Sequence, residues 1–337
     1  MNNCSIIIPH HNNTSIIVNC LKSLYKHTAS NHEIIVVDNG SSDNSIQLIE
    51  EGFERTIIIK SKINLGYAGG CNLGAQKAKN NLLIFLNNDT EVTSNWINPL
   101  IDSLKNKDIA SVQPKIKNLT NKNYFDYAGA SGGFIDIFCY PFCRGRIFNK
   151  NEKDENQYDT EKEIFWASGT CFVTKKDIFI KSGMFDETLF AHMEEVDYHW
   201  RSQMLGYKIL ANPKSTIFHK GGETLSYKST KKTFLNHRNS LIIFLSNHKL
   251  NKLLLLSIPR LSLHFISILF DLLSLRPSHS FAQLKSLNWV LINIPYIIKK
   301  RAFNKSIQKK SYELVGMYKL SIVFNYFLLN RKKFSDY

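Results

Sequence analysis

The 337-residue sequence predicts an α/β protein with a mostly parallel central sheet, helices on both faces, and a helical region at its C-terminal end. Short apolar runs alternate with amphipathic segments through the first part of the chain, which is the pattern of repeated strand and helix units. The charge also divides the chain. Residues 1–207 carry 21 Lys and Arg against 24 Asp and Glu, whereas residues 208–337 carry 22 against 4. We therefore expect one domain over residues 1–230 and a basic, aliphatic helical region over residues 231–337.

Four apolar runs are the expected parallel strands, over residues 5–8, 34–37, 56–59 and 82–86. The last run is an uninterrupted Leu-Leu-Ile-Phe-Leu, which is typical of a strand buried on both faces. After the first run, Asn13 or Thr14 can cap a helix whose apolar residues recur at helical spacing. Ligands of open α/β sheets collect at the carboxyl ends of the strands, so the residues that follow these runs are candidate binding residues.

Polar side chains follow each expected strand. Asp38 precedes a Gly turn and is well placed to accept hydrogen bonds from a ligand, and Asp89 can hold a divalent metal. Glycines at residues 66–70 let the backbone approach a phosphate or sugar, but neither a Rossmann nor a P-loop pattern is present, which disfavours nicotinamide and ATP. Ordinary turns and helix caps are the alternative. The candidate residues that this pattern indicates are Asp38, Asn87, Asn88 and Asp89, together with the glycines that begin at Gly66.

The regular pattern breaks after the fourth strand and resumes later. Residues 114–163 hold several glycines and a charged run, which predicts a mobile loop over one edge of the cleft. The further expected elements are a helix over 96–106, strands over 110–113, 170–174 and 208–210, and a helix over 176–181.

A second candidate centre is the pair Glu194 and Glu195. Val196, Trp200 and Met204 recur at helical spacing, so both glutamates fall in the first helical turn, where the helix dipole stabilises anions. A Glu that projects into a cleft from a rigid helix is a suitable general base, and an exposed helix start is the alternative.

The basic charge does not indicate a nucleic-acid-binding protein. All of the net positive charge lies in the C-terminal region among long aliphatic runs, a combination that suits an anionic membrane surface better than DNA. The six cysteines show no paired framework, and the looser pair Cys139 and Cys143 lacks a second pair for zinc. The first residues lead directly into a strand without a signal pattern, so we expect a cytoplasmic location.

The aliphatic runs of the C-terminal region, over residues 241–245, 253–258 and 261–275, are interrupted by Arg260, His264 and Asp271, and Pro259 is expected to break the helix. No stretch provides the clean apolar length of a spanning helix. We expect helices that lie in the membrane interface, with helices packed on the first domain or on a second copy as the alternative. The expected basic cluster comprises Lys299, Lys300, Arg301, Lys305, Lys309 and Lys310.

In their order along the chain, these motifs resemble the family 2 glycosyltransferases, which have the nucleotide-binding α/β fold called GT-A. Ser-Ile-Ile-Ile-Pro-His-His-Asn at 5–12 is similar to the family's opening strand and loop, and Val-Val-Asp-Asn-Gly-Ser-Ser-Asp at 36–43 to its nucleoside-binding motif. Asn-Leu-Gly-Tyr-Ala-Gly-Gly-Cys-Asn at 64–72 and Leu-Asn-Asn-Asp-Thr at 86–90 resemble its rhamnosyltransferase-like branch. The resemblance extends from about residue 4 to residue 222.

The resemblance implies roles for individual residues. Asp38 would accept from the base of a UDP- or dTDP-sugar, with the Pro9 to Asn12 loop in the same pocket. Glu195 would deprotonate the acceptor hydroxyl, with Glu194 as the second candidate. The other implied donor-site residues are Asn64, Gly66, Asn88, Asp89, Trp166 and Arg238, and the implied ligands of Mg²⁺ or Mn²⁺ are Asp89 and His219. Two positions depart from the family pattern, since Asn87 replaces the first Asp of Asp-x-Asp and Glu195 replaces an Asp.

The implied activity is inverting transfer of a hexose, for example rhamnose, from a UDP- or dTDP-sugar to a saccharide acceptor. The acceptor would be lipid-linked, in cell-surface polysaccharide biosynthesis, at the inner face of the cell membrane. The alternatives are a catalytically inactive membrane scaffold of the same fold and a nucleotidyltransferase. A homodimer is also left open.

Overall fold

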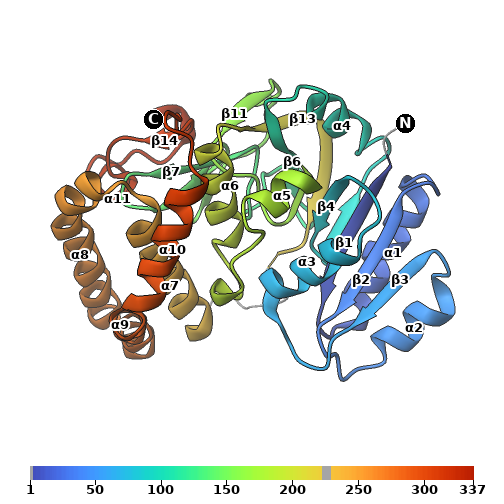
Figure 1. Cartoon of the computed structure of the whole chain (residues 1–337), viewed down its shortest axis with the longest axis horizontal. Helices are drawn as coiled ribbons and strands as arrows, with labels where there is room; N and C mark the ends of the chain where they lie inside the picture. The colour runs from blue at the N-terminus through green and yellow to red at the C-terminus, as the bar shows by residue number, and fades with distance from the viewer. Residues whose placement is uncertain (1–2, 222–228) are drawn as a thin grey trace.

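The computed structural model describes residues 3–221 and 229–337, so Met1, Asn2 and Gly222 of the sequence motifs lie outside the described residues. A central sheet with helices on both faces forms one part of the molecule, and the C-terminal helices pack beside it (Figure 1). The expected α/β class is confirmed.

The four expected parallel strands are all present. They are β1 (Cys4–His10), β2 (Glu33–Asp38), β3 (Thr56–Lys60) and β4 (Leu82–Leu86). They lie in the order β4-β1-β2-β3 and are parallel, with His10 beside Asp38 and Ile7 beside Phe85. Their carboxyl ends therefore meet at one edge of the sheet, where ligands of such sheets bind.

The other half of the sheet is mixed. Its strands are β5 (Thr90–Val92), β6 (Ile109–Asn118), β11 (Lys162–Ile164), β12 (Cys171–Lys175) and β13 (Lys208–His219). Strand β12 lies between β4 and β6 and is antiparallel to both, whereas β13 is parallel to β6. The helices of this part are α1 (Thr14–His27), α2 (Ser45–Gly52), α3 (Gly66–Lys77), α4 (Asn98–Leu104), α5 (Lys176–Lys181) and α6 (Glu194–Met204).

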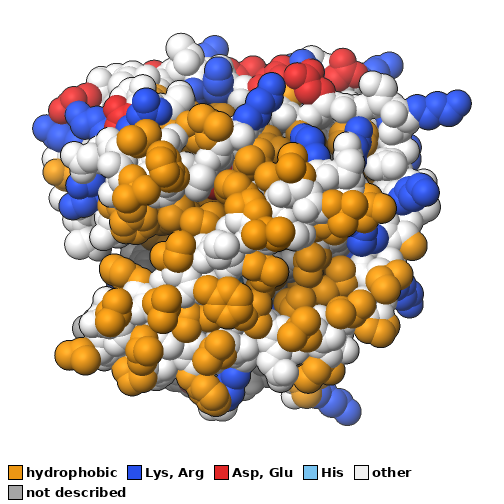
Figure 2. Space-filling model, turned by 90° about the vertical axis from the view of Figure 1, so that its left-hand side faces the viewer, with side chains coloured by type: hydrophobic (Ala, Val, Ile, Leu, Met, Phe, Trp, Pro, Cys, Tyr) orange, Lys and Arg blue, Asp and Glu red, His pale blue; other side chains and the backbone are white. Residues whose placement is uncertain are grey.

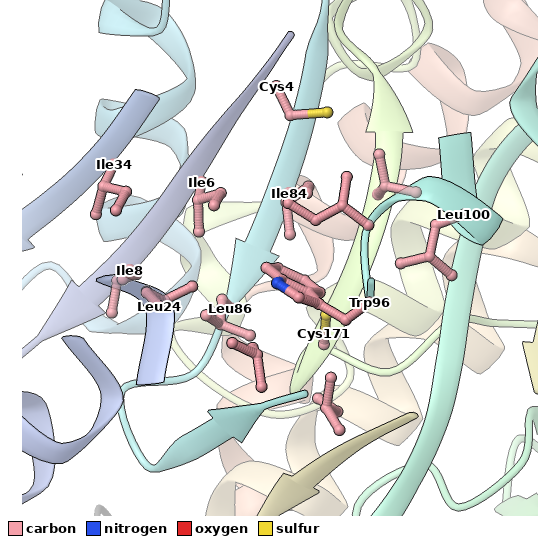
Figure 3. Close-up of a cluster of buried hydrophobic side chains, with 14 of the residues drawn as sticks. Cys4, Ile6, Ile8, Leu24, Ile34, Ile84, Leu86, Trp96, Leu100 and Cys171 are labelled. Carbon is pink, nitrogen blue, oxygen red and sulfur yellow. The ribbon is translucent and has the colours of Figure 1, made fainter. Parts of the chain in front are cut away.

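The core follows from the alternation of side chains along the buried strands. Ile6 and Ile8 of β1 face one layer of helices and Ile7 faces the other. Figure 3 shows the cluster that contains Ile6 and Ile8, with Trp96 near its centre. The indole Nε1 of Trp96 donates to Thr28 Oγ1 at 3.1 Å, so this large side chain is buried without an unpaired donor.

The expectation of a mobile loop over residues 114–163 is wrong. Strand β6 continues to Asn118, and much of the remainder folds into a second sheet. The strands of this small sheet are β7 (Gly133–Asp136), β8 (Pro141–Cys143), β9 (Arg146–Ile147), β10 (Lys150–Asn151) and β14 (Met317–Tyr318). Because β14 comes from the end of the chain and pairs with β7, long-range backbone pairing orders a segment that has no periodicity of its own.

The C-terminal helices are α7 (Thr230–Asn247), α8 (Leu250–Leu273), α9 (Pro277–Ile292), α10 (Ile294–Ile307) and α11 (Ile322–Phe327). The expected helix break at Pro259 is wrong, because α8 continues through it as one 24-residue helix. By length and composition alone, α8 is long and apolar enough to cross a membrane, which also corrects the expectation that no stretch reaches that length.

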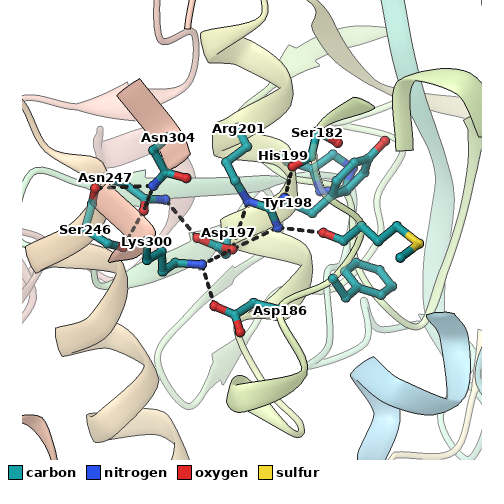
Figure 4. Close-up of polar contacts among 12 residues, drawn as sticks. Ser182, Asp186, Asp197, Tyr198, His199, Arg201, Ser246, Asn247, Lys300 and Asn304 are labelled. Atoms are coloured by element: carbon teal, nitrogen blue, oxygen red, sulfur yellow. Dashed lines mark hydrogen bonds and ion pairs between the residues drawn. The ribbon is translucent and has the colours of Figure 1, made fainter. Parts of the chain in front are cut away.

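The basic cluster expected around residue 300 is not wholly on the surface. Lys300 is 8% exposed, and its Nζ lies 2.6 Å from Asp186 Oδ2 and 2.8 Å from Asp197 Oδ2 (Figure 4). Asp197 also pairs with Arg201 at 2.9 Å and accepts from Asn247 Nδ2 at 3.0 Å. This network connects α10 and α7 to the helix that begins with the two candidate glutamates, so firm contacts cross the expected boundary at residue 230.

Candidate active site

The carboxyl ends of β1 and β2 bring Pro9, Asn12 and Asp38 together. Asn12 has a left-handed backbone (φ 57°), its side-chain oxygen accepts from Ser42 N at 2.8 Å, and its N–H donates to Ser41 Oγ at 3.0 Å. Asp38 is 7% exposed and accepts from Ser41 N at 2.8 Å through Oδ1. Asn12 therefore joins the loops after the two strands, and the Asp38 carboxylate is held by its own loop.

Asn64 and Gly66 adjoin this region at the start of α3. Asn64 Oδ1 accepts from Gly66 N at 2.8 Å, and the carbonyl of Gly66 accepts from Asn39 Nδ2 at 3.1 Å. Gly66 has φ +71°, and a Cβ there would lie 2.4 Å from the carbonyl oxygen of Phe190. Only glycine fits this position, because the left-handed backbone and the close approach both exclude a side chain.

Asn88 lies beside the end of β1, where its Nδ2 is 2.9 Å from His10 Nδ1. The other ring nitrogen of His10 is 2.9 Å from Ser45 Oγ. The side chain that follows β4 is thus joined to the same edge of the sheet as Asp38, as the sequence predicts.

Asp89 and His219 meet where β4 ends and β13 ends. His219 Nε2 lies 3.0 Å from Asp89 Oδ1, and His219 Nδ1 lies 2.8 Å from Asp126 Oδ1. Asn87 Nδ2 is 3.3 Å from the same Nε2 atom. All three members of the Asp89, His219 and Asp126 group are less than 8% exposed. Burial alone lowers the pKa of His219, but the two carboxylates raise it to about 10.

Without a metal, the raised pKa means that His219 carries a proton on Nε2 and forms an ion pair with Asp89. The arrangement fits a divalent cation that takes the place of this proton. Asp89 Oδ1 is buried and has no hydrogen bond of acceptable geometry, although it faces His219 Nε2. Asp89 Oδ1 and His219 Nε2 would supply a carboxylate oxygen and an imidazole nitrogen, which are ligands that divalent transition-metal ions such as Mn²⁺ accept. Asp126 holds the other ring nitrogen, as a carboxylate behind a metal-binding histidine does. In the described part of the chain, no three His, Cys, Asp or Glu side chains form a metal cluster.

Glu194 and Glu195 begin α6 and line the same cavity as Asp89 and His219, a space of about 250 Å³. Burial raises the pKa of Glu195 to about 7, although the backbone N–H of Gly169 and the N–H groups at the helix start oppose the rise. Burial and the neighbouring Glu195 raise the pKa of Glu194 well above its ordinary value. One oxygen of each carboxylate has no partner among the described residues. Such a carboxylate is suited to take a proton near neutral pH.

Trp166 forms part of the wall of this cavity, with its Nε1 donating to Phe134 O at 2.8 Å. Tyr67 closes another part and donates to Gly169 O at 2.5 Å. Arg146 and Lys232 also line the cavity, and both lie over the ring of Tyr127, at 4.4 and 5.5 Å from its centroid. Two cations therefore border the space in front of the glutamates.

The structure does not bring Arg238 to this cavity. Its guanidinium donates to the carbonyls of Thr188 and Leu189 at 2.7 and 3.1 Å and lies over the ring of Trp289. Arg238 holds the loop before α6 against α7 and α9, which differs from the expected contact with a diphosphate. We therefore do not propose it as a donor-binding residue.

Sequence reasoning missed Asp126, Tyr67, Arg146 and Lys232. Asp126 and Arg146 lie in the segment expected to be a loop, and no local pattern marks a carboxylate whose partner is His219, distant in sequence. Tyr67 stands inside the matched motif at 64–72, so its place beside the cavity could have been anticipated from that motif.

The fold and the site together define the class. A sheet with parallel β3-β2-β1-β4, an antiparallel β12 next to β4, and an acidic segment after β4 is the GT-A fold of the nucleotide-sugar transferases. Residues 5–183, which are more than half of the chain, match the family model described as "Glycosyl transferase family 2". The chain belongs to that family.

Known relatives agree with this assignment. The chain is 25% identical over 197 residues to glycosyltransferase GlyG of Streptococcus pneumoniae, covering 57% of this chain and 61% of the relative. It is 22% identical to the N-acetylglucosaminyl-diphospho-decaprenol L-rhamnosyltransferase of Mycobacterium tuberculosis, covering 68% and 79%. Among solved structures, GalNAc-T7 with UDP, GalNAc and Mn²⁺ has the same fold, with a TM-score of 0.57, 19% identity and coverage of 72% and 47%. The chain thus spans less than two thirds of the length of GlyG.

Proposed function

We propose that this protein is an inverting glycosyltransferase that moves a hexose, for example rhamnose, from a UDP- or dTDP-sugar to a saccharide acceptor. One observation carries the proposal: the Asp89 and His219 pair and the partly exposed Glu195 line a single cavity. A sugar whose leaving diphosphate lies at the first pair and whose acceptor lies at Glu195 would have its reacting carbon between them.

Different residues of the chain bind the nucleoside, activate the acceptor and shape the cavity. Asp38 and the Pro9 to Asn12 loop bind the nucleoside, and Asn64, Gly66 and Asn88 border the same site. Glu195 takes the proton of the acceptor hydroxyl as it attacks. Trp166 and Tyr67 shape the sugar end of the cavity and exclude water. A single carboxylate base that activates the acceptor favours one displacement, with inversion at the anomeric carbon.

Asp89 and His219 would hold Mg²⁺ or Mn²⁺. Such an ion, when bound, offsets the charge of the leaving nucleoside diphosphate. Two protein ligands are enough for an ion that also takes oxygens from the phosphates of its substrate. The Mn²⁺ and UDP present in the GalNAc-T7 structure support this choice.

A lipid-linked acceptor in cell-surface polysaccharide biosynthesis fits the chain best. The M. tuberculosis relative is named for an acceptor that carries a diphospho-decaprenol. Helix α8 provides an exposed apolar surface, and all of the net positive charge of the chain lies in the C-terminal region. We accordingly propose a location at the inner face of the cell membrane, with peripheral attachment.

A thermal-shift screen with UDP, dTDP, GDP and ADP, each with and without Mn²⁺, tests the donor site. UDP or dTDP should stabilise the protein only with Mn²⁺, by about 2.7 kcal/mol at a concentration 100 times the Kd. Asp38→Ala and Asp89→Ala should both lose this stabilisation, whereas Asp102→Ala, an exposed carboxylate, should keep it. Lack of stabilisation by every nucleotide would favour the inactive scaffold.

Asp126→Asn should weaken Mn²⁺ binding about 10- to 100-fold in the presence of UDP. The amide keeps the shape of the side chain but no longer favours the imidazole form that carries its proton on Nδ1 and directs Nε2 at the ion. Free Mn²⁺ can be counted by its electron paramagnetic resonance signal during a titration, which needs no turnover. Equal affinity in Asp126→Asn and Asp102→Asn would show that Asp126 does not position His219.

A further inference from the structure

Helix α8 turns three of its polar residues inward and many of its large apolar residues outward. Arg260, His264 and Asp271 are at most 8% exposed, whereas Leu255 and Leu273 are 76% and 83% exposed. The buried groups have partners, since Arg260 donates to Tyr140 OH at 2.9 Å and to Ser240 Oγ at 3.0 Å. Asp271 accepts from Gln283 Nε2 at 2.6 Å. Arg260, His264 and Asp271, which interrupt the apolar sequence, therefore all lie in the interior of the protein.

The apolar surface extends beyond α8. Most large apolar side chains that are exposed in the described part of the chain lie between residues 250 and 329, on α8, α9, α10 and around α11. Figure 2 shows this face covered with hydrophobic side chains, with Lys and Arg side chains at its margins. We call it the apolar face. A continuous apolar surface of this extent on a protein marks a membrane or protein contact.

A cavity of about 300 Å³ opens beside the apolar face, between the end of α7, the start of α8 and the end of α10. Lys249, Arg301 and Lys305 line it together with His248, and no Asp or Glu is among its lining residues. The first turn of α8 at its edge also contains no acidic residue. Leu250 lines the same cavity and is 62% exposed, so the cationic cavity adjoins the first residue of the apolar helix.

We propose that the apolar face lies on an anionic lipid bilayer and that the cavity of Lys249, Arg301 and Lys305 binds the phosphate of a lipid headgroup. This inference deepens, and rests on, the proposed peripheral membrane location. Cationic cavities at the end of an apolar helix have the position and charge that phosphate headgroups require. A second copy is a poorer occupant, because a two-fold contact would bring together two C-terminal regions that each contain far more Lys and Arg than Asp and Glu.

The test compares two variants that lose the same charge. Lys249→Gln with Lys305→Gln removes two exposed lysines of the cavity, and Lys299→Gln with Lys310→Gln removes two exposed lysines outside it. Binding of the full chain is measured by sedimentation with vesicles of phosphatidylcholine alone and of phosphatidylcholine with phosphatidylglycerol. The wild type should prefer the anionic vesicles at least about tenfold. The cavity variant should lose at least about fivefold more affinity than its control.

Each other outcome overturns part of the proposal. Equal losses in the two variants would mean that the charge acts diffusely and that the cavity binds no headgroup. If inorganic phosphate binds in the cavity and the cavity variant binds vesicles as well as the wild type does, the cavity is a site for a soluble phosphate. Failure of the wild type to bind vesicles, with a dimer seen by light scattering, would assign the apolar face to a second copy. Stabilisation by nucleotide and Mn²⁺ is measured on the same samples, so failure of the donor site is distinguished from failure of the membrane site.

Discussion

Replacing Glu195 with glutamine should lower the rate of sugar transfer by about 10²- to 10⁴-fold while the affinity for nucleotide and Mn²⁺ stays unchanged. The amide has the shape of the carboxylate and can still accept from the Gly169 N–H, but it cannot take a proton from the acceptor hydroxyl. Turnover at saturating donor and acceptor measures the loss, and the thermal shift with nucleotide measures the retained affinity.

Glu194→Gln is the matched control, because Glu194 is adjacent and more deeply buried, at 4% exposure. We expect a smaller loss of turnover in that variant, since its carboxylate is the less accessible of the two. A greater loss in Glu194→Gln than in Glu195→Gln would exchange the roles of the two residues. If neither variant slows transfer, the base lies elsewhere.

The pH dependence of the same reaction follows from the burial of Glu195, which raises its pKa to about 7. Only the deprotonated carboxylate can act as a base, so the turnover rate should rise with pH up to about 7 and level off above it. The rate should thus fall about tenfold for each pH unit below that value. A rate that is constant from pH 5 to pH 8 would contradict the assignment.

The strands and helices of the first half of the fold could be predicted because each is specified by a pattern of neighbouring residues in the sequence. Five successive apolar residues identify Leu82–Leu86 as a doubly buried strand, and the polar residues at the strand ends place Asp38 and Asp89 at one edge of the sheet. The position of Glu195 in the first turn of a helix could be predicted in the same way, from the helical spacing of the apolar residues that follow it.

The second half depends on contacts between distant residues. Residues 133–136 form a strand because residues 317–318 pair with them, and Asp126 matters because it meets His219. Neither partner can be read from periodicity. Arg260, His264 and Asp271 counted against a long apolar helix in the sequence, yet all three lie on the inward face of α8. Only the packing against Tyr140, Ser240 and Gln283 reveals this.

Lys300→Met should lower the free energy of unfolding by about 3–5 kcal/mol at pH 7, because it leaves buried carboxylates without one of their cations. In the native protein, Lys300 lies between Asp186 and Asp197 (Figure 4), and Asp197 is fully buried. Burial alone would raise the pKa of Asp197, but Lys300 and Arg201 hold it at about 2. Urea unfolding measures the loss, and the exposed neighbour Lys299→Met should stay within about 0.5 kcal/mol of the wild type.

The dependence of this loss on pH separates a lost ion pair from lost packing. The lowered pKa of Asp197 stabilises the native protein above the pKa of an unfolded Asp, about 3.9, and this stabilisation disappears as the pH falls toward 2. In Lys300→Met the native pKa values of Asp186 and Asp197 rise, so both carboxyls can become neutral in mildly acid solution. The deficit should therefore be greatest at neutral pH and shrink on acidification. A deficit that is the same at pH 7 and pH 4.5 would mean that Lys300 acts through the packing of its aliphatic chain. The charge network would then not be what holds α10 against α6, the helix that begins with Glu194 and Glu195.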